Sequence, residues 1–172
     1  RRDARIGERA GLRAVGDTSD TGLDAFYEVY ITSCERLGVR PLDRSFLAHE
    51  RARSPDAFFL QLALLDEKVV GGKAYLLADG YLRIIEGSSL RSGGVDALMP
   101  DVFLTREVLR HAVASGVTWV DYGVTEGVNE GLRRFKMRMG FKEDPRVVSL
   151  EPLSALSGAR QDVSLLEACN FG

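Results

Sequence analysis

The chain has 172 residues, of which 45% are hydrophobic and 28% are charged, so it is long enough for one domain with a buried core. Its formal net charge of −2 excludes a strong basic field and gives no support to general nucleic-acid binding. The longest apolar runs, such as FFLQLALL at residues 58–65, are too short to predict a membrane span.

The first part of the chain predicts short strands followed by two helices. Residues 5–16 have the pattern of one or two short strands. Residues 18–38 place apolar side chains at helical spacing, and Gly38 is a typical helix stop. A second helix is expected over residues 43–54, with Asp43 as its N-cap.

A meander of three antiparallel strands is expected next. The strands fall at residues 57–65, 69–78 and 81–87, joined by the turns Asp-Glu-Lys and Asp-Gly. Asp-Gly between two apolar runs is a strong hairpin signal. The glycine pair at 71–72 in the middle strand indicates a β-bulge, because glycine inside a strand often marks one.

A loop then leads into a long helix over about residues 97–115. Asp96 is expected to cap this helix, and Gly116 is expected to end it. Helical spacing selects one apolar face for it, made of Leu98, Val102, Leu109 and Val113. The strand expected at residues 117–123 contains Trp119, which we expect in the core.

The clearest helix signal lies at residues 129–140. Asn129 is a typical N-cap, Gly140 can close the last turn in a left-handed conformation, and the apolar face is Leu132, Phe135 and Met139. A final strand is expected at residues 146–150. The remaining sequence is weakly patterned, with a short helix near residues 162–168.

This order of elements predicts an α/β (α+β) fold. Antiparallel hairpins come first and a crossover helix comes later, which implies a mixed, mostly antiparallel twisted sheet with helices on both faces. We expect one domain over residues 1–152 and a C-terminal tail over residues 153–172. The chain opens with Arg1, so we interpret it as a processed chain or a fragment.

The cysteines and histidines favour neither disulfide nor metal chemistry. Cys34 and Cys169 lie far apart and outside any metal-binding spacing, which is typical of unpaired thiols in a reducing, cytoplasmic compartment. His49 and His111 have no acidic or cysteine partner at the spacing of metal ligands, so no metal site is expected.

Two sets of residues resemble a known superfamily. Asn129, Phe135, Gly140 and Phe141 match the last helix of the GNAT acyltransferase superfamily, where Lys136 takes the place of a common tyrosine acid. The sequences DYG at 121–123 and RFK at 134–136, together with VVGGKAYLL at 69–77, are similar to the FemABX (FemAB-like) branch of that superfamily. The resemblance covers roughly residues 20–150 and implies the GNAT fold.

The resemblance also implies a reaction, the transfer of an acyl or aminoacyl group to a primary amine. Acyl transfer passes through an oxyanion that a fixed ammonium can stabilise, and Lys136 would supply it. The alternative for Lys136 is a solvated helix face. Asp121 would orient the amine or accept its proton, or would serve as a turn residue or an ion-pair partner. Glu86, at the end of a strand, would act as a base through water.

The donor-binding loop is expected at residues 88–96. GNAT enzymes hold the CoA pyrophosphate on backbone amides of a glycine-containing loop at a helix N-terminus. Here the expected donor-binding residues are Ser88, Arg91, Gly93 and Gly94. Asp96 stands where a small residue is usual, and at about 4 Å its carboxylate would repel a phosphate by roughly 4 kcal/mol per charge pair.

The resemblance leaves three functions open. A FemABX-like enzyme would take aminoacyl groups from aminoacyl-tRNA, whereas an ordinary GNAT N-acetyltransferase would use acetyl-CoA or another acyl-CoA. A GNAT-fold binding module without catalysis is the third option. FemABX enzymes carry two such domains in tandem and this chain matches only the second, so we expect a fragment, one half of a homodimer, or a single-domain relative.

Overall fold

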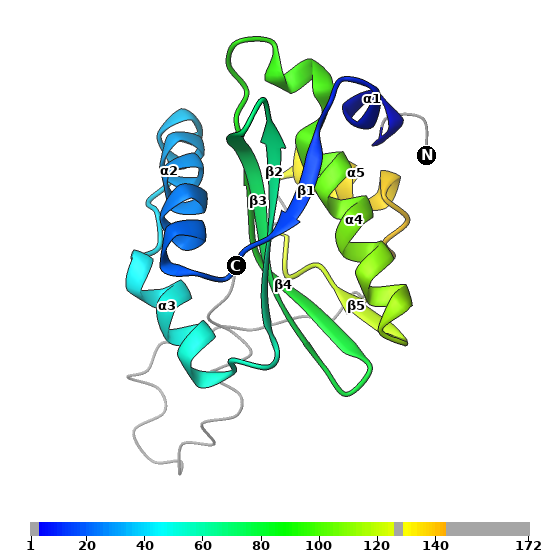
Figure 1. Cartoon of the computed structure of the whole chain (residues 1–172). Coiled ribbons are helices and arrows are strands. Elements are labelled where there is room, and N and C mark those ends of the chain that lie inside the picture. Colours follow the sequence, from blue (N-terminus) through cyan, green and yellow to red (C-terminus); the bar gives the residue numbers. More distant parts are fainter. Residues whose placement is uncertain (1–3, 126–128, 144–172) are drawn as a thin grey trace, which may run out of the picture. The chain divides into compact units, whose positions relative to one another are not determined.

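The computed structural model describes residues 4–125 and 129–143 (Figure 1). The chain divides into two compact units, residues 1–121 and residues 122–172. The strand predicted at 146–150, the helix predicted near 162–168 and the expected tail lie outside the described residues. No helix in the described part of the chain is long and apolar enough to cross a bilayer.

The first unit is built on a five-stranded sheet whose strand order follows the chain: β1 (Arg13–Gly16), β2 (Phe58–Leu65), β3 (Lys68–Ala78), β4 (Tyr81–Ser89) and β5 (Trp119–Asp121). The first four strands are antiparallel, and β5 runs parallel to β4. Helices cover both faces, with α2 (Asp20–Leu37) and α3 (Arg44–Arg53) on one side, and α1 (Ala4–Arg9) and α4 (Pro100–Ala114) on the other (Figure 1). The predicted mixed sheet is confirmed.

Capping residues set the bounds of α2 and α3, and the sequence predicted two of them, Gly38 and Asp43. The Ser19 side chain accepts a hydrogen bond from the Gly22 amide at the start of α2. Gly38 ends α2 in the left-handed region at φ 67°. The Asp43 side chain accepts from the Ser45 amide at 2.8 Å and caps α3.

Both predicted hairpins are present as two-residue turns. Asp66 and Glu67 join β2 to β3 with φ values of 47° and 64°, and Asp79 and Gly80 join β3 to β4 with 49° and 76°. Positive φ at both central residues is the type I′ geometry that matches strand twist. The predictions of the meander and its turns are confirmed.

Two bulges interrupt the meander. Between β2 and β3 the register skips Val70, directly beside the glycine pair where a bulge was predicted. Between β3 and β4, Ala74 pairs with Glu86 while Tyr75 pairs with Ile84, so Ile85 is the extra residue on β4. A bulge bends its strand locally and re-aims the side chains around it.

Four predictions in the first unit are wrong. Residues 4–9 form α1 rather than a strand, because so short a segment does not separate the two periodicities. Helix α4 begins at Pro100, a residue favoured at the first helical position, and the preceding residues form the short 3₁₀ helix η1 (Val95–Leu98). Asp96 therefore does not cap α4. Trp119 is 59% exposed and lies outside the core.

The fourth error concerns the buried face of α4. Its core side chains are Phe103, Leu104, Val108 and Ala112, whereas Val113 is 79% exposed. The helix carries apolar residues on two adjacent stripes of its surface. The stripe that packs in the core is not the one that helical spacing predicted.

The second unit contains α5 (Glu130–Arg138), which confirms the predicted helix. The Asn129 side chain accepts from the Leu132 amide at 3.1 Å, and Gly140 closes the end at φ 96°. Leu132, Phe135 and Met139 are the predicted stripe, and all three are half-buried.

Candidate active site

Strand pairing at one edge of β4 ends early. The pairing of β5 with β4 covers three registers and stops at Arg83 and Asp121. Within the first unit, β4 continues to Ser89 without a further β5 partner, and the bulge at Ile85 follows directly. All three residues of β5 are paired, and the longer β4 extends past its partner from Ile84 to Ser89.

Glu86 lies on this stretch and faces α2. Its register partner Ala74 belongs to the core cluster that includes Tyr30 and Cys34 of α2. Burial raises the pKa of the Glu86 carboxyl to about 7, while a hydrogen bond from the Gly87 amide and the charge of Lys73 act in the opposite direction. The carboxyl thus exchanges its proton near neutral pH.

The α2 groups beside Glu86 remain protonated. Burial raises the pKa of the Tyr30 hydroxyl and of the Cys34 thiol, and the negative charge of Glu86 adds to both shifts. The Tyr30 hydroxyl also accepts a hydrogen bond from the Leu42 amide at 3.1 Å. The sequence indicated both residues as helix core but gave no sign that they lie beside Glu86.

Lys73 is a charged residue that the sequence analysis missed. The residue is 1% exposed in the middle of β3, and its Nζ lies 2.5 Å from Oδ1 of Asp101 at the start of α4. A Cβ at position 87 would come within 2.8 Å of that Nζ, so Gly87 leaves room for the ammonium. The available signal was a single charge inside the apolar run VVGGKAYLL.

The loop after β4 carries the predicted donor-binding residues. Ser88 is buried near the end of β4, whereas Arg91, Gly93 and Gly94 are exposed. Both glycines are left-handed, at φ 61° and 80°. The loop's own hydrogen bonds use the amides of Val95, Ala97 and Met99, and among the described residues the two glycine amides have no partner.

Asp121 ends β5 at the last register with β4. It accepts a hydrogen bond from the Tyr81 hydroxyl at 2.8 Å. This contact links the first residue of β4 to the last residue of β5. Any role of Asp121 in proton transfer would compete with its bond to Tyr81.

Lys136 belongs to the second unit and is half-buried there. Its Nζ donates to the carbonyls of Gly123 at 2.8 Å and Val124 at 3.2 Å, and lies 5.3 Å from the centre of the Tyr122 ring. The ammonium is therefore not in bulk water. It holds together the segment that precedes α5.

The structure thus distributes the predicted site residues over two units. Glu86, Ser88, the loop residues and Asp121 belong to the first unit, and Lys136 belongs to the second. Within residues 4–125 and 129–143, no three His, Cys, Asp or Glu side chains gather as metal ligands would.

Comparison with known families identifies the class of protein. The family model described as Acetyltransferase (GNAT) domain matches residues 1–137. The chain therefore belongs to the GNAT acetyltransferase domain family and is an acyltransferase by class. No curated protein sequence matches it.

Solved structures share the fold at low sequence identity. FemX is 16% identical with a TM-score of 0.71, over 81% of this chain and 53% of FemX. The aminoglycoside acetyltransferase meta-AAC0020 from an uncultured soil metagenomic sample, in complex with sisomicin, is 14% identical with a TM-score of 0.59, over 82% and 95%. AAC(6')-Iy, in complex with the bisubstrate analog CoA-S-monomethyl-acetylneamine, is 16% identical with a TM-score of 0.58, over 82% and 97%.

Proposed function

We propose that this chain transfers an acyl group from an activated donor to a primary amine, with Glu86 accepting the amine's proton. The observation that carries the proposal is a carboxyl with a pKa of about 7 on β4, just past the end of the pairing with β5. A general base works best when its pKa lies near the working pH.

The reaction needs one proton acceptor and one oxyanion site. The amine gives a proton to the Glu86 carboxylate, and its nitrogen lone pair attacks the donor carbonyl to form the C–N bond. The resulting oxyanion collapses and breaks the bond to the leaving group, which takes up a proton. A fixed donor at the oxyanion is worth about 3 kcal/mol in the transition state.

The remaining predicted residues have supporting roles in this proposal. Lys136 would stabilise the oxyanion, although it would have to leave the two carbonyls that it now binds. Asp121 would orient the amine. Ser88, Arg91, Gly93 and Gly94 would hold the phosphate or carbonyl oxygens of the donor.

The likeness to FemX and the position of Asp96 favour a FemABX-like aminoacyl donor such as aminoacyl-tRNA. Asp96 is exposed on η1, two residues after Gly94, and it makes no cap at α4. A carboxylate at this position would repel the negative charge of a pyrophosphate. A cytoplasmic location and a homodimer that would provide a second domain belong to the same proposal.

An acetyl-CoA donor is the second candidate, and a specific observation favours it. The amides of Gly93 and Gly94 have no partner among the described residues, which suits the binding of an anion. The structurally similar AAC(6')-Iy was solved with a CoA-containing bisubstrate analog.

Calorimetry separates the two donors. Tight binding of acetyl-CoA that Gly94→Asp abolishes and Gly116→Asp leaves intact would establish the CoA enzyme. Gly116 is a matched control because it is also left-handed, at φ 71°, and a Cβ added there would have no neighbour within 4 Å. No binding at millimolar acetyl-CoA, with transfer from aminoacyl-tRNA, would establish the FemABX-like enzyme. If neither donor binds, the chain is a non-catalytic module.

A further inference from the structure

Lys73 places a positive charge inside the sheet, and this charge has no role in the proposed reaction. The residue is buried in β3, and its ammonium pairs with the Asp101 carboxylate of α4. Taking two charges out of water is costly, and well-packed apolar residues of similar volume are often as stable as a buried ion pair. Stability alone therefore gives little reason for a lysine at this position.

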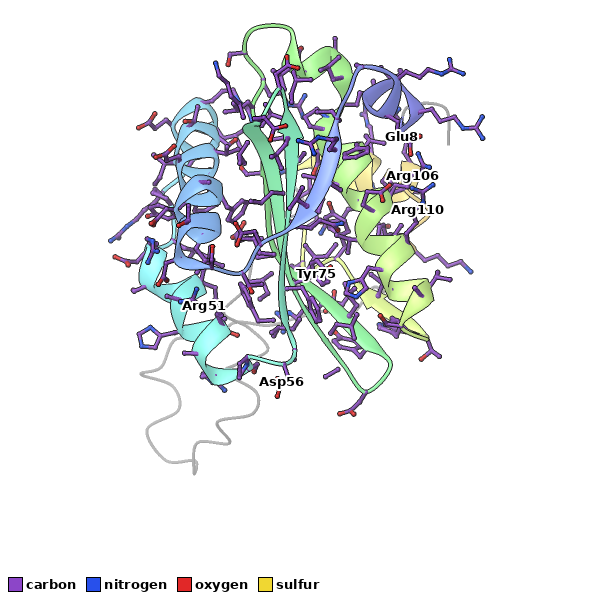
Figure 2. All side chains as sticks on the ribbon, viewed as in Figure 1. Glu8, Arg51, Asp56, Tyr75, Arg106 and Arg110 are labelled. Carbon is purple, nitrogen blue, oxygen red and sulfur yellow. The ribbon has the colours of Figure 1, made fainter. Side chains whose placement is uncertain are left out.

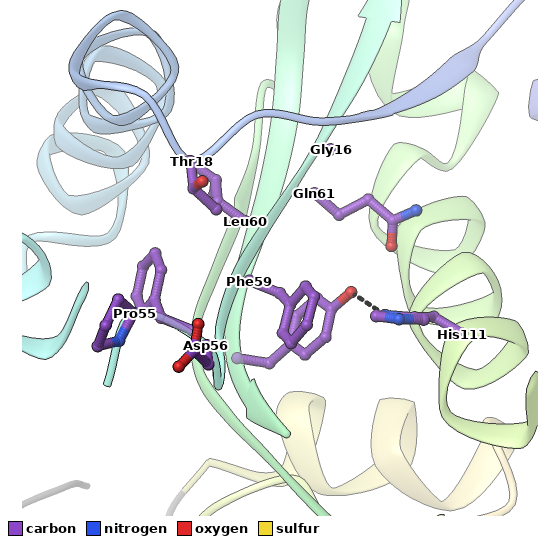
Figure 3. Close-up of a pocket in the computed structure, with 10 residues that line it drawn as sticks. Gly16, Thr18, Pro55, Asp56, Phe59, Leu60, Gln61 and His111 are labelled. Atoms are coloured by element: carbon purple, nitrogen blue, oxygen red, sulfur yellow. Dashed lines mark hydrogen bonds between the residues drawn. The ribbon is translucent and has the colours of Figure 1, made fainter. Parts of the chain in front are cut away.

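Lys73 and Glu86 lie on opposite faces of the sheet. Successive residues of a strand face opposite sides, and Tyr75, two positions after Lys73, faces α4 through its contact with His111 (Figure 3). Ala74, which lies between them in β3, packs in the core cluster with α2, and its register partner is Glu86. Lys73 therefore lies behind the sheet as seen from Glu86.

Gly87 brings the two charges close to each other. It is the register partner of Lys73 and follows Glu86 in the chain. A Cβ added at position 87 would lie 2.8 Å from the Lys73 Nζ and 3.2 Å from its Cγ, so the lysine side chain packs directly on this glycine. The Gly87 amide donates a hydrogen bond to the Glu86 carboxylate. The ammonium and the carboxylate thus both lie against Gly87.

The other groups around Glu86 have weaker or opposite effects. On α2, the Tyr30 hydroxyl and the Cys34 thiol stay protonated, because burial raises the pKa of both. On β4, Arg83 is on the same face as Glu86 but is partly exposed, so solvent screens its charge. The charge of Lys73 is buried, and it opposes the effect of burial on the pKa of Glu86.

We propose that Lys73 is a positioning residue of the transfer site, and that its charge, held in place by Asp101 and Gly87, sets the pH range in which Glu86 accepts the proton of the amine. The inference rests on the proposed function, because it concerns the same base. With the ammonium in place, Glu86 is ionised over more of the neutral pH range and can accept a proton there. Without it, burial would keep the carboxyl protonated to higher pH, and less of the enzyme would hold the base form.

A ¹³C NMR titration of the Glu86 side-chain carboxyl in the full chain tests the proposal without requiring transfer activity. The Glu86 signal is the one missing from Glu86→Gln, and its wild-type midpoint is expected at about pH 7. Lys73→Met combined with Asp101→Asn removes both charges of the pair, and the midpoint should rise by about one pH unit. Gly87→Ala keeps every charge but displaces the ammonium, and the midpoint should rise by about half a pH unit.

Glu8→Gln combined with Arg106→Met is the matched control. It removes another ion pair of α4, in which the two charged groups are 2.8 Å apart, and it should leave the Glu86 midpoint unchanged. The proposal is overturned if the midpoint keeps its wild-type value in both test variants, or if it moves as far in the control. If the double variant of Lys73 and Asp101 does not fold, Gly87→Ala decides the result alone.

The rate of acyl transfer separates this inference from the proposed function. In the test variants, the pH at which the rate levels off should move with the NMR midpoint. If Glu86→Gln loses activity but the midpoint does not move in the test variants, this inference is wrong and the proposed function stands. If the midpoint moves but Glu86→Gln transfers the acyl group at the wild-type rate, the proposed function is wrong, and Lys73 then acts on a carboxyl that the reaction does not use.

Discussion

Replacing Glu86 with glutamine should stabilise the protein at alkaline pH. The pKa of this carboxyl rises from 4.5 to about 7 because burial disfavours its charged form. At about 1.4 kcal/mol per pH unit, keeping the carboxyl ionised in the folded state costs about 3 kcal/mol. Glutamine keeps the size and the acceptor oxygen but never ionises.

The sign follows from proton linkage. The folded state holds the Glu86 proton to a higher pH than the unfolded state, so this contribution to stability is complete below pH 4.5. It is lost as the pH rises through 7. Wild type and Glu86→Gln should therefore have similar stability at about pH 4, and the variant should be more stable by about 3 kcal/mol at about pH 8.5.

Urea unfolding of both proteins across this pH range measures the difference directly. Other carboxyls with lowered pKa values, such as Asp17, Asp20 and Asp43, contribute equally to both proteins and cancel. A constant difference at all pH values, or a variant that is less stable at pH 8.5, would refute the claim that Glu86 is a desolvated carboxyl.

Three further changes test the packing around the site. Gly72→Ala should lower the free energy of unfolding in urea by about 2 kcal/mol, because a Cβ there would come within 3.0 Å of Phe26 Cε2 and 3.2 Å of Leu62 Cδ2. The control Gly16→Ala should change it little, because the nearest neighbour of a Cβ there is 4.0 Å away. Lys73→Met should lower the free energy of unfolding by about 3 kcal/mol, because it leaves Asp101 without its buried partner. Adding Asp101→Asn should recover part of that loss. If the double variant recovers none of it, the ion pair is not the stabilising contact that Lys73 makes. Lys136→Met should speed hydrogen exchange in residues 129–141 because it removes donors from two carbonyls, whereas unchanged exchange would show that those bonds are not formed.

Figure 2 shows the side chains of the described residues, and several that it labels have tertiary partners that the sequence could not predict. Glu8 of α1 pairs with Arg106 at 2.8 Å and Arg110 at 3.5 Å on α4, and Tyr75 reaches the same helix. These contacts join residues about 100 and 36 positions apart. Local patterns carry no information about such pairs, so the sequence predicted α4 as a helix but predicted neither the helical form of α1 nor its packing against α4.

Local chemistry explains what was predicted correctly. The helix stop at Gly38, the caps at Asp43 and Asn129, and the turn at Asp79 and Gly80 depend only on neighbouring residues, and the structure confirms the elements that they bound. The site was harder to predict. Glu86 was expected at a strand end, but its burial against α2 and the bulge at Ile85 depend on tertiary contacts.

The proposed function depends on Glu86 acting as the base of an acyl transfer at the edge of β4. The pH dependence of transfer to a simple amine such as ethanolamine, from whichever donor binds, tests this role without intermediate steps. We expect a wild-type rate that rises tenfold per pH unit and levels off above about pH 7, and a loss of about 10²-fold or more in Glu86→Gln. A variant with the wild-type rate and the same pH profile would show that Glu86 is not the base.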